Sequence, residues 1–343
     1  RDIRDTGLHC PLVVRIPEKF KHLWPNDERG TTVDRLVSFI DMPKTWLAIA
    51  GAEIPEAMQG RVFLGPKSEP EPEYHHAFVS RYDARLDNSR AVRDKRFLYI
   101  RHYMPYAIYG QYIEYRARGR FYQEWLRLFR EGKLDAAEAS YFQPKPVEEL
   151  YDTQADPDNV VNLVESSKHA ATLQRLRRRL REWQLEIHDA GLGPEKEMER
   201  LAKDRNTTVA EFVRDKRQYD LPAYLDAADQ ALLPDGGGDG LNDETRVAKL
   251  IERAQNDQSP FVRYWATVGL MIRAQLDGDR RGSAAFKAAL NDSWRTTRVV
   301  AAVGLIELED SGMEAVDASD CLKTLIEQGD PDGGYACLDA LNA

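Results

Sequence analysis

A repeat of 35 residues near the C-terminus constrains the fold of this chain more than any other feature of its sequence. The segment Val262–Leu270 aligns with Thr297–Leu305, and both segments end in Val-Gly-Leu. Two sets of positions follow the same period: Trp265, Val300 and Tyr335, and Ala266, Ala301 and Ala336. A single helical hairpin cannot bury its own apolar face, so hairpins of this kind stack on one another. We therefore expect residues 243–343 to form HEAT-like helical repeats.

A glycine-rich stretch precedes the repeats. Residues 234–240 read Pro-Asp-Gly-Gly-Gly-Asp-Gly, a composition typical of a flexible connection. We expect a linker over residues 231–242 that separates the helical repeats from the rest of the chain.

The first 101 residues alternate between apolar runs and turn residues. The run Leu12–Ile16 lies between two prolines and predicts a short buried strand entered from a loop. Apolar residues recur at helical spacing from Thr32 to Ala50, and a proline interrupts them, which predicts a pair of helices. Residues 77–80 and 91–101 predict strands of a small antiparallel sheet, with a tight turn at Asp94.

Composition excludes several classes of function. The chain has 343 residues, and its 48 Lys and Arg against 57 Asp and Glu give a net charge of −9, which disfavours a general nucleic-acid-binding role. Its three cysteines show no C-x-x-C spacing, so the sequence predicts neither a zinc site nor a disulfide framework. No apolar run approaches the roughly 20 residues of a membrane span.

The most suggestive side chains lie between residues 80 and 87. Arg81, Asp83 and Arg85 alternate, so an extended segment presents two guanidinium groups on one side. Arginine forks bind sulfate, phosphate and carboxylate oxygens, although surface ion pairs across a loop explain the same pattern equally well. The neighbouring residues His75 and His76 point to opposite faces of a strand, so we expect no metal site from them.

Five blocks of the sequence, taken in order, resemble the sulfatase family, the formylglycine-dependent sulfuric ester hydrolases of the alkaline-phosphatase superfamily. Gly7–Pro17 is similar to the family's G-x-x-x-P-L-I-V-R-x-P strand. The other four blocks are Val37–Gly51, Ile54–Leu64, Arg90–Arg101 and Glu149–Leu163. The insertion between residues 103 and 142 looks most like the bacterial branch that is similar to heparan N-sulfatases, some of whose members carry helical repeats.

The resemblance implies a fold class and a domain order. Residues 1–65 are expected to be the end of the sulfatase α/β domain, and residues 66–230 the small antiparallel subdomain with a helical insertion. An all-α repeat unit follows the linker.

The resemblance also implies the chemistry of a longer parent protein. Sulfatases oxidise a Cys or Ser in a C-x-P-S-R motif to formylglycine, whose hydrated aldehyde attacks sulfur beside a bound calcium ion. This chain has no such motif, and the family's calcium ligands would lie before Arg1. We therefore expect the chain to be inactive and to bind no cofactor, because it lacks the N-terminal part of the sulfatase domain. In the parent, a sulfated carbohydrate is the expected substrate, and Arg81, Asp83, Arg85 and His9 are its expected contacts.

Two alternative functions for this chain or its parent belong to other classes of protein. The parent is a phosphodiesterase or phosphonate hydrolase of the same superfamily if its nucleophile is Thr beside a second metal site. The chain is a non-catalytic binding protein if the helical repeats are its working surface. The sequence leaves the cellular compartment open.

Overall fold

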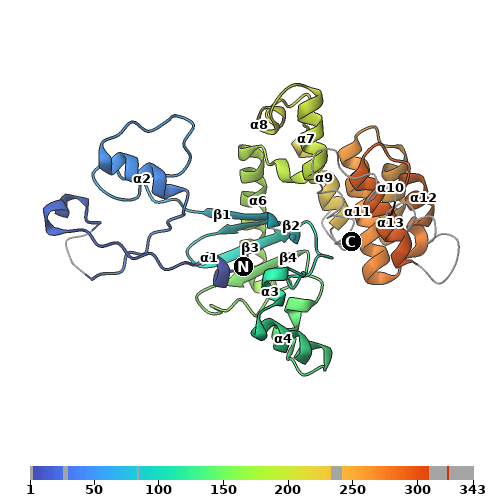
Figure 1. The fold of residues 1–343 in the computed structure, drawn as a ribbon, viewed down its shortest axis with the longest axis horizontal. Coiled ribbons are helices and arrows are strands. Elements are labelled where there is room, and N and C mark those ends of the chain that lie inside the picture. The colour runs from blue at the N-terminus through green and yellow to red at the C-terminus, as the bar shows by residue number, and fades with distance from the viewer. Residues whose placement is uncertain (1–2, 26–29, 83–84, 233–241, 309–322, 324–343) are drawn as a thin grey trace. The chain divides into compact units, whose positions relative to one another are not determined.

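The computed structural model describes residues 3–25, 30–82, 85–232, 242–308 and 323. Two compact units divide the chain. The first comprises residues 1–78, 90–100 and 148–180, and the second comprises residues 79–89, 101–147 and 181–343. Both contribute to one four-stranded sheet, whose strand order is β1-β2-β3-β4 (Figure 1). Its strands are β1 (His75–Tyr82), β2 (Arg85–Arg93), β3 (Phe97–His102) and β4 (Glu148–Asp152).

Short connections and backbone hydrogen bonds fix the direction of the strands. Two residues join β1 to β2 and three join β2 to β3, lengths that permit only antiparallel neighbours. The Thr153 N–H donates to the Arg96 carbonyl, and the His102 N–H donates to the Val147 carbonyl, so β3 and β4 also run antiparallel. The predicted small antiparallel sheet, with its turn at Asp94, is confirmed.

The segment expected to be the first buried strand differs from the prediction. Residues Leu12–Ile16 adopt no strand, and the side chain of Val13 is 91% exposed. A strand needs a neighbour for its backbone hydrogen bonds and an apolar partner for its buried face. Among the described residues this segment pairs with no strand, and residues 12–15 are exposed, which explains the difference; Ile16 is partly buried, and its carbonyl accepts from Trp24 Nε1.

The expected helix pair over residues 32–50 is a single helix, α2 (Asp41–Ala50). The Asp41 carboxylate accepts the backbone N–H groups of Ser38 and Arg61, so it starts the helix and ties it to the following loop. Pro43 lies in the first turn, where a missing N–H costs nothing, and therefore belongs to the helix instead of interrupting it.

Gly60 is required where the loop after α2 returns to that helix. It has a φ of +90°, and a Cβ built there would lie 2.2 Å from the Ile40 carbonyl oxygen. Only glycine combines this backbone conformation with such a close approach. This explains why the Gln-Gly pair stands in the block Ile54–Leu64.

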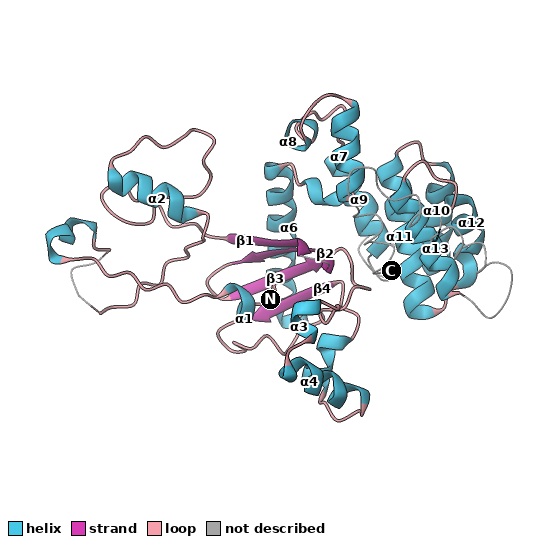
Figure 2. Cartoon of the chain, in the orientation of Figure 1, coloured by secondary structure: helices cyan, strands magenta, loops and turns pink. Residues whose placement is uncertain are grey.

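Helices dominate the rest of the chain (Figure 2). Those between β3 and β4 are α3 (Glu114–Ala117), α4 (Arg120–Arg130) and α5 (Ala136–Ala139). Those that follow β4 are α6 (Ala170–Ile187), α7 (Glu195–Asp204), α8 (Val209–Phe212), α9 (Leu221–Leu232), α10 (Asp243–Asn256), α11 (Pro260–Asp277), α12 (Ser283–Ala289) and α13 (Arg295–Glu307). A short helix α1 (Asp5–Leu8) lies near the N-terminus. No helix in the described ranges is long and apolar enough to cross a membrane.

Helices α9 to α13 pack side by side around the largest apolar core (Figure 1). The aligned positions Trp265 and Val300 are both buried, as are Ala266 and Ala301. Tyr335 and Ala336, the third copy of the pattern, lie outside the described residues. Two helical segments related by 35 residues thus share one core.

The aligned glycines of the two copies explain why the helices approach closely. A Cβ on Gly269 in α11 would lie 2.9 Å from the Cα of Ala231 in α9. A Cβ on Gly304 in α13 would lie 2.5 Å from the ring of Phe286 in α12. Each glycine therefore removes a side chain where a neighbouring helix must pass.

Candidate functional site

The sequence predicts Arg81 and Arg85 on one extended segment, but in the structure they lie on the two strands of a hairpin. Arg81 lies on β1 and Arg85 on β2, with the connection between them, so they occupy different strands. Asp83, the third member of the predicted set, lies outside the described residues. The expectation of one continuous extended segment is therefore wrong, because the chain reverses direction within it.

Arg81 forms an ion pair at one side of the hairpin. Its Nε donates to Glu195 Oε2 at 2.8 Å. The arginine side chain is mostly buried, whereas about half of the glutamate side chain is exposed. A guanidinium group at this position is oriented by a carboxylate that water reaches from one side.

Arg85 belongs to a buried cluster of charges centred on Asp87. One Asp87 oxygen accepts from Arg85 at 2.8 Å, and the other accepts from Lys145 Nζ at 2.6 Å. All three side chains are almost completely removed from solvent. Burial of a charge is costly unless it is paired and hydrogen-bonded, and here the carboxylate has two cationic partners.

The cluster continues into a chain of hydrogen bonds whose direction follows from the partners. The Ser89 hydroxyl donates to the Asp87 carboxylate at 3.2 Å, so toward His102 Nδ1, 2.7 Å away, it serves as acceptor. Nδ1 then carries a proton, and Nε2 lies 3.0 Å from the Tyr109 hydroxyl. The chain of contacts thus runs from Asp87 through Ser89 and His102 to Tyr109.

The charges around Asp87 decide the protonation of its carboxyl group. Burial raises the pKa of Asp87, but the positive charges of Lys145 and Arg85 and the hydrogen bond from Lys145 outweigh burial and hold the pKa below its ordinary value. Asp87 is therefore a carboxylate throughout the physiological range. It orients its cationic partners and holds β2 to the segment before β4.

Only part of the Asp87 cluster can be predicted from the sequence. Asp87 follows Arg85 by two positions on a strand, so strand periodicity places both on one face. Lys145 is 58 residues further along the chain, and no local pattern connects it with β2. His102, Ser89 and Tyr109 likewise meet only when the strands pair.

His9, the fourth predicted contact, belongs to the other compact unit. Three quarters of its side chain is exposed, and its Nδ1 lies 3.5 Å from Asp5. Asp5 accepts from Arg93 Nε at 2.7 Å, and its backbone N–H donates to the side chain of Asn159 at 2.7 Å. The ring of His9 is thus held near a buried carboxylate while most of it faces water.

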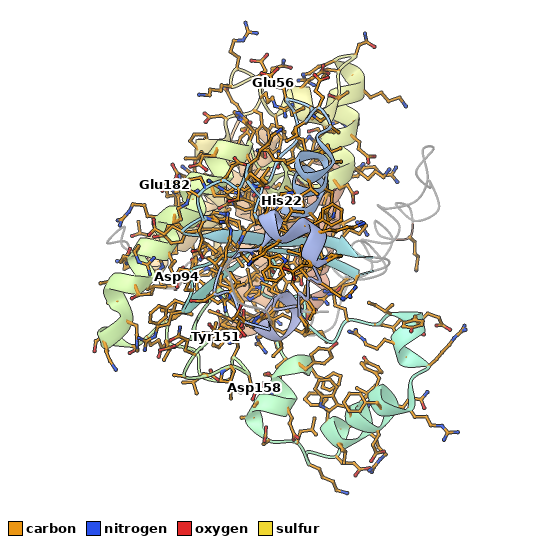
Figure 3. All side chains as sticks on the ribbon, turned by 90° about the vertical axis from the view of Figure 1, so that its left-hand side faces the viewer. His22, Glu56, Asp94, Tyr151, Asp158 and Glu182 are labelled. Carbon is orange, nitrogen blue, oxygen red and sulfur yellow. The ribbon has the colours of Figure 1, made fainter. Side chains whose placement is uncertain are left out.

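Ion pairs also hold two arginines of the same unit, Arg4 and Arg175. Arg4 donates to the buried carboxylate of Glu149 at 3.0 Å and lies over the ring of Tyr151. Arg175 donates to Asp94 at 2.6 Å and to Tyr74 at 2.9 Å. Asp94 lies in the β2–β3 turn and Tyr151 on β4, and both are labelled in Figure 3. Arg4 and Arg175 thus have hydrogen-bond partners within the unit, which indicates a structural role for both.

The described residues do not fit a calcium site. Within them, no group of three or more His, Cys, Asp or Glu side chains is close enough together to hold a metal ion. Asp87, the most buried carboxylate of the cluster, already accepts from a lysine and an arginine. We therefore derive no chemical step through calcium on this chain.

Comparison with known protein families gives a match over the N-terminal part. Residues 1–119 match the family described as N-sulphoglucosamine sulphohydrolase, C-terminal. This segment contains α1, α2, β1, β2, β3 and α3. The match supports the sulfatase family for this part of the chain.

Two curated relatives are both described as ulvan-active sulfatases of Formosa agariphila. One is 41% identical over 199 residues, covering 58% of this chain and 32% of the relative. The other is 28% identical over 187 residues, covering 53% of this chain and 34% of the relative. The chain thus spans about a third of the length of these relatives.

Solved structures of sulfatases share weaker similarity. One is BT4656 in complex with D-glucosamine-2-N,6-O-disulfate, at 20% identity and a TM-score of 0.27, covering 42% of this chain and 23% of the other. Another is BT1596, described as a 2-O GAG sulfatase, at 17% identity and a TM-score of 0.31, covering 49% and 28%.

Proposed function

We propose that this chain is the C-terminal part of a sulfatase whose complete form hydrolyses sulfate esters or N-sulfates of a carbohydrate. The observation that carries the proposal is the match of residues 1–119 to a C-terminal sulfohydrolase family, joined by a relative at 41% identity that is a sulfatase. That relative's description names ulvan, so a sulfated algal polysaccharide is a reasonable first substrate to test.

The exposed apolar run at residues 12–16 supports the proposal from the structure. Val13 is almost fully exposed, and Leu12 and Val14 are more than two-fifths exposed. Apolar residues lined up between prolines are typical of a strand that another part of a larger fold covers. In the complete sulfatase, this run would complete a sheet that belongs mostly to the α/β domain.

Formylglycine and calcium belong to the same proposal. Formylglycine would supply the nucleophile and calcium would polarise the sulfate, both in the part of the parent that precedes this chain. Cys10, in the sequence His-Cys-Pro-Leu, does not stand in a C-x-P-S-R motif. We accordingly propose that the chain by itself has no sulfatase activity.

Arg81, Asp83, Arg85 and His9 are the proposed contacts for the sugar or its sulfate. Arg81 is mostly buried, and the half-exposed Glu195 orients its guanidinium group, whereas His9 is largely exposed. Arg85 is held by Asp87, which would fix the position of its guanidinium group. An Arg81→Ala variant of the complete enzyme should raise KM more than it lowers kcat, with Arg178→Ala as the matched control.

The helical unit is proposed to be HEAT-like, and the insertion between residues 103 and 142 is proposed to place the parent in the heparan N-sulfatase-like branch. The 35-residue period, the shared core of α11 and α13 and the paired glycines Gly269 and Gly304 support stacked repeats.

The decisive experiment measures sulfate release by the complete gene product and by this chain. We expect the complete protein to release sulfate from an arylsulfate and from ulvan or heparan sulfate, and the chain to release none. Sulfate release by the chain would refute its proposed inactivity. Cleavage of a phosphodiester by the complete protein, without sulfate release, would refute the sulfatase assignment.

A further inference from the structure

The helical insertion between β3 and β4 exposes aromatic rings that its own core does not need. Tyr112, Tyr115 and Phe121 are 62%, 89% and 78% exposed. They fall within ten consecutive residues of the sequence, on and around α3 and the start of α4. Three large rings left in water on one short segment indicate a surface that meets a ligand.

A compact aromatic core supports this surface from beneath. The ring of Trp125 stacks on Tyr141 with centroids 4.4 Å apart, and Phe129 packs against Phe142 at 4.9 Å. Phe121 lies at the edge of this core, with its ring 5.6 Å from that of Trp125. The exposed ring therefore has a rigid support and loses little conformational freedom when a ligand covers it.

The same segment concentrates positive charge in an acidic chain. Residues 112–130 contain five arginines and two glutamates, whereas the whole chain carries a net charge of −9. Arg118 pairs with Glu114, and Arg127 pairs with Glu124. Arg120 and Arg130 are exposed and form no ion pair with any residue that the structure describes. Figure 3 shows long side chains projecting outward from these helices.

We infer that this aromatic and arginine-containing surface, defined by Tyr112, Tyr115, Arg120 and Phe121, binds a sulfated polysaccharide. The inference rests on the proposed function for its choice of ligand. Sugar rings carry an apolar face of C–H groups that an aromatic ring covers, and free guanidinium groups pair with sulfate oxygens. Such a surface would hold a polymeric substrate near the enzyme between rounds of hydrolysis.

Single-stranded nucleic acid has related chemistry, because its bases also stack on aromatic rings and its phosphates pair with arginine. A sulfated polysaccharide is a polyanion too, so the net charge of −9 does not separate the two ligands. The proposed function favours the polysaccharide, and oligo(dT) distinguishes the two in the test.

The test measures binding of the whole 343-residue chain to ulvan or heparan sulfate by affinity electrophoresis. We expect retardation by the sulfated polymer and none by the same polymer after chemical desulfation. Tyr115→Ala with Phe121→Ala should weaken binding by about tenfold. Arg120→Ala should weaken it as well and flatten its dependence on salt.

Matched controls keep the result specific. Phe78→Ala removes an exposed ring, and Arg178→Ala removes an exposed arginine, both outside the insertion, so neither should change the affinity. Circular dichroism should show unchanged melting for all variants, since every substituted side chain is exposed. Equal binding of the desulfated polymer, equal losses in the controls, or tighter binding of oligo(dT) would each overturn the inference.

The result of this binding experiment can be distinguished from the result of the sulfate-release experiment. Sulfate release by the complete enzyme without polysaccharide binding by this chain would overturn only the inference about the insertion. Binding by this chain without sulfate release by the complete enzyme would overturn only the sulfatase assignment.

Discussion

Lys145 Nζ lies 2.6 Å from an oxygen of Asp87, and neither side chain reaches solvent. The contact joins β2 to the segment before β4 across 58 residues of sequence. Arg85 occupies the other carboxylate oxygen, so a single anion holds two buried cations. The stability of this part of the second unit therefore depends on Asp87.

Replacing Asp87 by Ala should lower the free energy of unfolding by about 3–5 kcal/mol, because two buried cations lose their anion. The double variant Asp87→Ala with Lys145→Met should be less destabilised, because it removes one of these cations as well. Urea unfolding followed by circular dichroism measures both. Glu199→Ala breaks an exposed ion pair and should change little. A double variant as unstable as the single one would contradict this interpretation.

The same carboxylate predicts a pH dependence. The pKa of Asp87 is lower in the folded chain than its ordinary value near 3.8, because Lys145 and Arg85 outweigh the effect of burial. The stabilisation is therefore complete above the unfolded pKa and is lost as the pH falls through the folded pKa. The difference in unfolding free energy between the wild type and Asp87→Ala should stay constant from pH 7 to pH 5 and shrink below about pH 4. A difference that shrinks already near pH 6 would contradict this assignment to Asp87.

Local patterns predicted the sheet, while contacts between distant residues escaped them. Alternating apolar residues and a turn at Asp94 sufficed for β2 and β3, because strand periodicity and turn chemistry are local. The reversal between Arg81 and Arg85 was missed, since arginines alternate in the same way on one strand or across a hairpin. Lys145 was missed because nothing near it in the sequence points to Asp87.

Two further differences between prediction and structure show that contacts between distant residues can decide the local conformation. Pro43 breaks a helix in its interior and is tolerated in its first turn, and only the observed start of α2 at Asp41 shows which applies. The run Leu12–Ile16 has the composition of a buried strand, but composition supplies no partner strand. Sequence patterns thus indicate which surfaces need partners and leave the partners themselves unidentified.

Gly60→Ala should destabilise the loop between α2 and β1. The new Cβ would meet the Ile40 carbonyl at 2.2 Å, and the φ of +90° is strained for alanine, so we expect a loss of about 2–4 kcal/mol. Gly51→Ala is the control, with a φ of +70° and open space around the new methyl group. Its cost should be about 1 kcal/mol. Thermal unfolding that ranks the two variants equally would refute the steric argument.

The glycines of the repeat should be sensitive in the same manner. Gly304→Ala places a methyl group 2.5 Å from the ring of Phe286, and Gly269→Ala places one against the backbone of Ala231. Forcing the helices apart should cost about 1–3 kcal/mol in each case, despite the better helix propensity of alanine. Gly278→Ala meets nothing within 4 Å, but the glycine has a φ of +65°, so this comparison variant should cost about 1 kcal/mol through backbone strain alone. Stabilisation by either repeat substitution would show that the helices do not need this close contact.

The exposed run at Leu12–Ile16 gives opposite expectations in the chain and in a complete sulfatase. Val13→Lys should leave the melting temperature of this chain unchanged and reduce its binding of the dye ANS, because the valine is 91% exposed here. In the complete protein the same change would bury a charge without a partner and should cost several kcal/mol of stability. Val160→Lys, at an exposed valine of the same unit, should be harmless in both proteins. If Val13→Lys is equally harmless in the complete protein, the run is a surface segment and the larger sheet proposed to cover it does not exist.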